Sequence, residues 1–193
     1  MHKNKIVSKE QYGFRGGFTT ENTVYKLINE VLNAFNNKQI VGGIFCDFTK
    51  AFDCVDNDIL ISEMENYGVI GKGKELFQSY IKDRYQWVLI DNKTNHNTTV
   101  SNWARIKHGV PQGSVLCPTL FLLYINDLPA VISTKAISVL FADDTRVLFT
   151  HSNFMEFHVN IETAFIIQVL RYSTVFHVTP KHALIIQERL KRQ

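Results

Sequence analysis

Two adjacent carboxylates, Asp143 and Asp144, interrupt a stretch whose apolar residues alternate as they do in a β-strand. The alternation precedes the pair and resumes at Val147 and Phe149. Aspartate disfavours strands and favours turns, so the sequence predicts a β-hairpin with the acid pair at or near its tip. Two like charges between apolar strands need a counter-charge, although a solvated turn that merely carries two acids explains this stretch alone equally well.

A third carboxylate, Asp47, ends another apolar run that includes Ile44. If the two strands are neighbours in one sheet, the three acids converge on one spot. Carboxylates about 4 Å apart repel by on the order of 4 kcal/mol at an effective dielectric of roughly 20, so such a cluster must raise its pKa values or hold a cation. The donors are carboxylate oxygens, with no Cys or His among them, so they suit a hard ion. Mg²⁺ is the first choice and Mn²⁺ is an alternative. Two such ions can clamp the attacking and leaving oxygens of a phosphoryl transfer, which is the chemistry that these residues favour.

The composition is that of one ordinary globular domain, since 45% of the 193 residues are hydrophobic. The longest apolar run, at 115–125, is shorter than the roughly 20 residues that cross a bilayer, and the N-terminus does not resemble a signal peptide. Three cysteines without metal-ligand spacing favour a reducing compartment. We therefore expect an intracellular protein, in the nucleus or the cytoplasm, with no membrane partner; its oligomeric state is left open.

Periodicity predicts helices and strands around these acids. Thr20 is a suitable N-cap for a helix that ends at Asn36 and Asn37, and a strand over 40–46 follows and presents Asp47. The other expected elements are helices over 56–67 and 74–83, strands over 86–91 and 98–107, an apolar helix ending before Pro129, and a helix over 154–170. The helix over 74–83 should bury Leu76, and no structure is predicted for 171–193.

Three segments occur in the order of the successive palm motifs of a reverse transcriptase. They are Phe45-Cys46-Asp47-Phe48-Thr49-Lys50-Ala51-Phe52-Asp53, then the run from Gly109-Val110-Pro111-Gln112-Gly113-Ser114 to Asn126-Asp127-Leu128-Pro129, then Phe141-Ala142-Asp143-Asp144. The long middle motif is similar to that of non-LTR retrotransposons, jockey-type elements especially. Gln11-Tyr12-Gly13-Phe14-Arg15 resembles the segment that those enzymes carry just before the palm.

The resemblance implies a fold of the α+β class, a polymerase palm in which an antiparallel β-sheet has helices packed on one face. Residues 1–36 would form a partial fingers segment and the first helix, 37–150 the palm, and 151–193 a degraded segment after it. In the family, strands that grip the triphosphate precede this region and a primer-gripping thumb follows the palm. We expect the fingers to be partial and the thumb to be absent here.

The resemblance also assigns catalytic and metal-binding roles to the acids. By motif match, Asp47 and Asp143 would be ligands of both Mg²⁺ ions. Asp144 would lie beside them near the primer 3′ end, and the backbone carbonyl of Phe48 would be a further ligand.

A nucleotide-binding segment would follow the first of these acids. Phe52 matches the position whose ring closes the pocket under the sugar and excludes a 2′-hydroxyl, and Thr49-Lys50-Ala51 leads up to it. Gln112 and Gly113 match the loop that lies against the incoming nucleotide and the template base. The alternatives are plain core packing for Phe52 and a simple helix start for the Pro-Gln-Gly turn.

Two basic residues are candidates for phosphate contacts. Arg15 lies in the glycine-containing loop before the first helix, and Lys181 faintly matches a lysine of a small strand downstream in the family. The chain also departs from the family pattern, because Cys117 stands where members usually have glycine and Thr119 where they have an apolar residue.

The implied function is RNA-templated DNA synthesis by an RNA-directed DNA polymerase, part of a retrotransposon reverse transcriptase and expected here as a truncated copy. A nucleotide would pass from a dNTP to a primer 3′-hydroxyl by a two-metal mechanism, with an RNA template and a DNA primer as partners. Three alternatives remain: an inactive retroelement remnant that binds nucleic acid weakly, a group II intron-type reverse transcriptase, and a two-metal nuclease.

Overall fold

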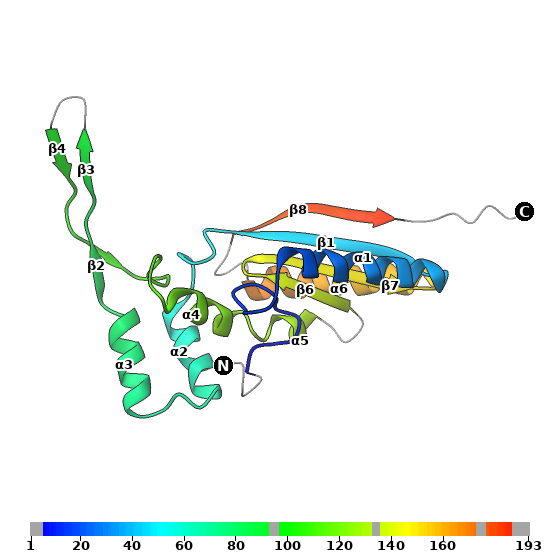
Figure 1. The fold of residues 1–193 in the computed structure, drawn as a ribbon, viewed down its shortest axis with the longest axis horizontal. Coiled ribbons are helices and arrows are strands. Elements are labelled where there is room, and N and C mark those ends of the chain that lie inside the picture. The colour runs from blue at the N-terminus through cyan, green and yellow to red at the C-terminus, as the bar shows by residue number, and fades with distance from the viewer. Residues whose placement is uncertain (1–5, 93–96, 133–135, 173–176, 187–193) are drawn as a thin grey trace, which may run out of the picture.

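A four-stranded antiparallel sheet in the order β6-β7-β1-β8 forms the centre of the molecule. The computed structural model describes residues 6–92, 97–132, 136–172 and 177–186. The strands of this sheet are β1 (Ile40–Thr49), β6 (Ala136–Phe141), β7 (Asp144–His151) and β8 (His177–Ile186). Figure 1 shows helices around the sheet and a hairpin arm that projects away from it. The expected α+β class with an antiparallel sheet is confirmed.

Some of the helices begin at a side-chain cap. The helices are α1 (Thr20–Asn36), α2 (Asn57–Asn66), α3 (Lys72–Ile81), α4 (Cys117–Tyr124), α5 (Leu128–Ile132) and α6 (Phe154–Tyr172). Thr19, rather than Thr20, is the N-cap of α1, and Asp56 accepts hydrogen bonds from the first amides of α2. Within the described residues, none of these helices has the length and hydrophobicity needed to cross a membrane.

The main hydrophobic core lies on one face of the sheet. Phe48 of β1 and Phe149 of β7 pack there with buried residues of α2, α4, α5 and α6. Helix α6 packs closely over Gly42, because a Cβ at this position would stand 2.6 Å from the ring of Phe157. The helices that complete this core therefore lie on the same face of the sheet.

The other face of the sheet is covered by α1. Val41, Val139 and Leu148 alternate with core residues along their strands, and they are buried at 1%, 0% and 3% exposure. Helix α1 contacts both β1 and β6, and Figure 1 shows it on the opposite side of the sheet from α6. This first helix adds a layer to the one-sided arrangement that was expected.

The predicted strands over 86–91 and 98–107 form two short ladders instead of one. The arm consists of β2 (Arg84–Gln86) paired with β5 (Ala104–Ile106), and β3 (Leu89–Asn92) paired with β4 (Asn97–Val100). Between the ladders the rings of Trp87 and Trp103 stack edge to face, with their centroids 5.9 Å apart. These bulky rings occupy the positions at which backbone pairing is interrupted.

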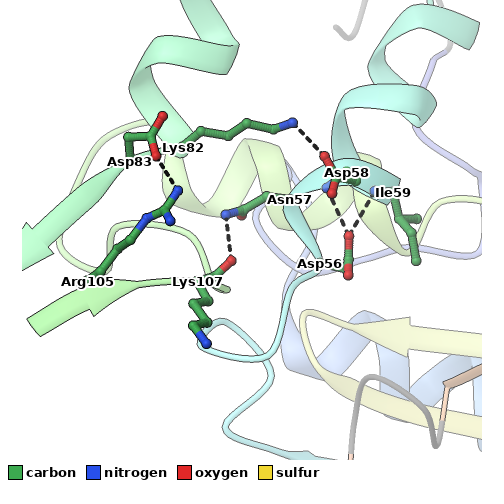
Figure 2. A network of polar contacts seen from close by, with 8 residues as sticks. All are labelled: Asp56, Asn57, Asp58, Ile59, Lys82, Asp83, Arg105 and Lys107. Atoms are coloured by element: carbon green, nitrogen blue, oxygen red, sulfur yellow. Dashed lines mark hydrogen bonds and ion pairs between the residues drawn. The ribbon is translucent and has the colours of Figure 1, made fainter.

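Polar contacts join the base of the arm to α2, as Figure 2 shows. Two of them reach α2: the ion pair of Lys82 with Asp58, and a 3.1 Å hydrogen bond from Nδ2 of Asn57 to the carbonyl of Lys107. The ion pair of Arg105 with Asp83 lies within the base of the arm. Since β5 leads directly into the loop at 109–114, these contacts also fix where that loop begins.

One prediction about the burial of a side chain was wrong. Leu76 was expected to be buried and is 66% exposed, and α3 begins at Lys72, two residues earlier than predicted. The apolar helix ends before Pro129, as predicted, because α4 stops at Tyr124. Pro129 lies near the start of α5, where a proline costs no helical hydrogen bond. The region from residue 171, for which no structure was predicted, supplies the end of α6 and strand β8 alongside β1.

Candidate active site

The acid pair lies at the tip of the hairpin between β6 and β7, as predicted. Phe141 and Asp144 form the closing residue pair, so Ala142 and Asp143 make up a two-residue turn. Ala142 has a φ of +55°, which matches the first turn position of a type II′ hairpin. Two-residue turns of this kind follow the right-handed twist of the flanking strands, and this one holds both carboxylates at the end of the sheet.

Strand β1 brings the third acid to the same place. Cys46 of β1 pairs with Thr145 of β7, which puts Asp47 and Asp144 one position further along the same ladder. Residues opposite one another on antiparallel strands have Cα atoms about 4.5–5.5 Å apart, so these two acids are neighbours in the sheet. The side chain of Asp47 lies outside the described residues, and its role as a metal ligand stays a prediction.

The two hairpin acids differ in their surroundings. The Asp144 carboxylate is half exposed and accepts a 3.3 Å hydrogen bond from Nη2 of Arg146. Asp143 is half buried and makes interactions of its own. Both offer carboxylate oxygens, the donors that Mg²⁺ prefers, so the residues fit a divalent ion. Among the described side chains, which do not include that of Asp47, no three Asp, Glu, His or Cys residues lie together so that they could hold a metal ion.

A tight turn after β1 places Phe52 at the edge of the core. The carbonyl of Lys50 accepts hydrogen bonds from the amides of Asp53 and Cys54, at 2.9 and 3.1 Å. The ring of Phe52 lies 4.4 Å from that of Phe121 between centroids. Phe52 therefore packs against the core, but its side chain is only partly buried there.

The segment around Phe52 contains both buried and exposed residues. Phe48 and Ala51 are buried at 2% and 3% exposure, and Lys50 is exposed with a φ of +54°. Thr49 belongs to β1, and its side chain lies outside the described residues. The nucleotide-binding role assigned to this segment stays a prediction.

The loop at 109–114 lies against this turn. The amide of Gly109 donates to the carbonyl of Val55 at 2.7 Å, and the amide of Val110 donates to the carbonyl of Phe52 at 2.9 Å. Gly109 has a φ of +89°, and a Cβ there would stand 2.7 Å from the carbonyl oxygen of Asp53. No other residue fits so close to a neighbouring backbone, so the glycine sets the approach of the two segments.

An open pocket of about 280 Å³ lies where the two segments meet. It is lined by Phe14, Phe52, Gln112, Gly113, Ser114, Cys117 and Pro118. Nε2 of Gln112 donates to Oδ1 of Asp53 at 2.7 Å, which ties the loop to the turn. The structure thus brings together Phe52, Gln112 and Gly113, which were predicted to act on one nucleotide.

Four residues of this pocket were not predicted to line it: Phe14, Ser114, Cys117 and Pro118. Phe14 belongs to the pre-palm segment, for which the sequence indicates a resemblance to the family but no role in a pocket. Its ring centroid lies 6.2 Å from that of Phe52. Cys117 stands where the family usually has glycine, and this departure is the sequence signal that sets the residue apart. Burial raises the pKa of the Cys117 thiol, and the negative charge of Asp53 raises it further, so the thiol stays neutral against the pocket.

The two phosphate-contact candidates differ in how far the structure describes them. Nη1 of Arg15 donates to the carbonyls of Ser8 and Gln11, each at 2.9 Å, and its guanidinium lies 4.8 Å from the ring centre of Phe18. Arg15 therefore holds its own loop together. Lys181 lies at the irregularity in the pairing of β8 with β1, and its side chain is outside the described residues. Phosphate contact stays a prediction for both.

Residues 1–170 match the sequence model of the family described as reverse transcriptase (RNA-dependent DNA polymerase). The chain belongs to this reverse transcriptase family. It is 32% identical over 162 residues to a probable RNA-directed DNA polymerase from transposon BS of Drosophila melanogaster, a match that covers 78% of this chain and 16% of that protein.

A second relative is the RNA-directed DNA polymerase from mobile element jockey of Drosophila melanogaster. It is 32% identical over 158 residues, which cover 75% of this chain and 16% of the relative. This agrees with the jockey-type resemblance of the long middle motif. The chain therefore spans about a sixth of the length of these relatives.

Solved structures support the fold. Apo telomerase from Candida tropicalis, truncated from its C-terminal domain, superposes with a TM-score of 0.62 at 17% identity. The superposition covers 94% of this chain and 37% of that one. At this identity the likeness establishes the palm-type fold and nothing more.

Proposed function

We propose that this chain forms the catalytic palm of a retrotransposon enzyme that copies an RNA template into DNA. The observation that carries the proposal is the sheet register: the Asp143–Asp144 hairpin stands beside the strand position of Asp47. Such a cluster of acids suits the two-metal chemistry of nucleotidyl transfer. Membership of the reverse transcriptase family supports the same reaction class.

In this proposal the acids hold the metal ions and place the primer end. Asp47 and Asp143 would share two Mg²⁺ ions, with the carbonyl of Phe48 as a further ligand and Asp144 beside the primer 3′-hydroxyl. When bound, such ions lower the cost of forming the 3′-alkoxide and of releasing pyrophosphate. No described side chain of the site acts as an obvious general base, so catalysis would depend on positioning and electrostatics.

The aromatic pocket would receive the deoxyribonucleotide. The ring of Phe52, braced by Phe121, would stand under the sugar and leave no room for a 2′-hydroxyl. Gln112, held by Asp53, would lie against the base pair that the incoming nucleotide forms with the template. These roles use residues from two distant motifs that meet at one pocket.

Primer extension by the full chain tests the proposal. With poly(rA) as template, oligo(dT) as primer, and Mg²⁺ and dTTP present, we expect extension that is lost in Asp143→Asn. Asp91→Asn is the matched control, since it removes an exposed carboxylate on the arm. Extension by the wild type and by Asp91→Asn alone supports the proposal. If the chain shows no extension that depends on Asp143, the proposal fails for this chain and the interpretation as an inactive remnant is favoured.

A further inference from the structure

The segment at 8–13 lies along the free edge of β6, next to the hairpin that carries the acids. Gln11 and Leu140 form a parallel bridge. The amide of Tyr12 donates to the carbonyl of Leu140 at 2.8 Å, and the amide of Leu140 donates to the carbonyl of Glu10 at 2.9 Å. The pre-palm segment thus extends the sheet by a short stretch that ends beside the turn.

The side chain of Gln11 is bonded to the turn itself. Gln11 is only 3% exposed. Its Oε1 accepts hydrogen bonds from the amide of Ala142 at 3.1 Å and from the amide of Gly13 at 2.8 Å. Its Nε2 donates to the carbonyl of Ala142 at 3.4 Å. Both backbone groups of the residue just before Asp143 therefore have the same partner, a side chain 131 positions away.

Two further contacts lock this arrangement. A Cβ on Gly13 would stand 2.1 Å from the amide nitrogen of Ala142, so the two backbones touch and no larger residue fits. On the other side, Nη1 of Arg15 donates to the carbonyl of Gln11 at 2.9 Å. The glutamine is thus fixed at its backbone and at its side chain.

The turn needs such support because of its conformation. Ala142 has a φ of +55°, a left-handed value that a residue with a Cβ rarely adopts. A hairpin of this type usually has glycine at that position. Hydrogen bonds to both backbone groups of Ala142 favour the observed turn over other conformations of the same two residues.

We propose that Gln11 is a positioning residue for the acid pair. By holding the backbone of Ala142, it fixes the conformation of the turn and so the position of the Asp143 carboxylate. In this way it sets the affinity of the site for divalent ions. The part that concerns ions rests on the proposed function. The part that concerns the turn rests on the contacts alone. If the hydrogen bonds of Gln11 only satisfied its own buried amide group, replacing this residue would leave the affinity for divalent ions unchanged.

The test uses the full chain with Gln11→Met, which keeps the length of the side chain and removes its hydrogen bonds. Amide hydrogen exchange at Ala142 is followed by NMR, and Mn²⁺ affinity is measured by calorimetric titration. We expect exchange at Ala142 to rise roughly tenfold, as loss of its hydrogen bonds implies, and Mn²⁺ affinity to fall at least severalfold.

Thr23→Val is the matched control, because Thr23 is 1% exposed and its hydroxyl donates to the carbonyl of Thr19 at 3.2 Å, within its own helix region. It should leave both readouts unchanged. If Gln11→Met does not fold, Gln11→Asn takes its place, since it keeps the amide and shortens the side chain by one methylene.

Each outcome bears on a different part of the proposal. Unchanged exchange at Ala142 in the Gln11 variant overturns the proposed hold on the turn. Faster exchange with unchanged Mn²⁺ affinity overturns the link to ion binding. A wild-type chain that binds Mn²⁺ no better than Asp143→Asn contradicts the proposed two-ion function instead, and Gln11 is then judged on the exchange at Ala142.

Discussion

Nη2 of Arg146 lies 3.3 Å from Oδ2 of Asp144, two residues earlier on β7. Residues two apart on a strand share a face, so a cation stands directly beside the acid pair. The side chains are 27% and 50% exposed, and such a pair stabilises the fold by about 1 kcal/mol at most. The ion pair matters more for divalent ions, because Arg146 competes with them for the carboxylate oxygens of Asp144.

Arg146→Gln should therefore strengthen binding of Mn²⁺. Removing a competing interaction of about 0.5–1 kcal/mol corresponds to a roughly two- to fivefold lower dissociation constant. Calorimetric titration of the full chain measures it. Arg105→Gln is the control, because Arg105 pairs with Asp83 on the arm, away from the hairpin. Weaker Mn²⁺ binding in Arg146→Gln would mean that the arginine orients the carboxylate rather than competing for it.

Phe52→Val should relax the selection of the sugar. The smaller side chain opens the floor of the pocket that Phe52 shares with Gln112, so a ribonucleotide gains access. In primer extension, the ratio of rNTP to dNTP use should rise on the order of tenfold, the scale on which steric exclusion discriminates substrates.

Phe18→Val is the control for this change, since Phe18 lies in the same loop as Phe14 but does not line the pocket. It should leave the ratio unchanged. An unaltered ratio in Phe52→Val would show that the ring serves only the core beside Phe121.

Much of the site was predictable because its signals are local. The hairpin at Asp143 follows from alternation and turn chemistry, and the start of α2 follows from the side chain of Asp56 as its N-cap. The meeting of Phe52 with Gln112 needed the family resemblance, since nothing in either segment alone indicates the other.

What escaped prediction depends on partners far away in the sequence. Strand β8 contains Pro180 and shows no clear alternation, and it forms because it pairs with β1. Leu76 occupies an apolar position of α3 that no neighbouring element covers. The hydrogen bonds of Gln11 to Ala142 have no local signature at all.

The close contact of α6 with β1 can be tested by a double-mutant cycle. Gly42→Ala places a Cβ 2.6 Å from the buried ring of Phe157, so we expect a loss of about 1–3 kcal/mol in the free energy of unfolding. Phe157→Leu removes the clash, and the double variant should lose less than the sum of the single variants, by roughly 1 kcal/mol.

Urea denaturation provides these values. Gly16→Ala is the control, because a Cβ there meets no atom within 4 Å, and its effect should stay within about 0.5 kcal/mol. Additive losses at Gly42 and Phe157 would show that the strand and the helix adjust independently.

Tyr124 should make the fold sensitive to alkaline pH. Burial at the end of α4 raises the pKa of its phenol to about 12, from an ordinary value of 10.0. The unfolded chain therefore releases this proton first, and the free energy of unfolding falls as the pH rises above about 10. Between pH 9 and 11.5 the phenol should account for a loss of about 2 kcal/mol, since one pKa unit corresponds to about 1.4 kcal/mol.

The contribution of this one phenol is isolated by comparing variants that differ from the wild type in a single hydroxyl group. Tyr124→Phe removes the group, so its stability in urea should decline less steeply than that of the wild type above pH 10. Tyr25→Phe is the control, since Tyr25 is 73% exposed and its phenol is solvated in both states. If Tyr124→Phe and Tyr25→Phe decline in parallel with the wild type, the phenol of Tyr124 is not held neutral by the fold.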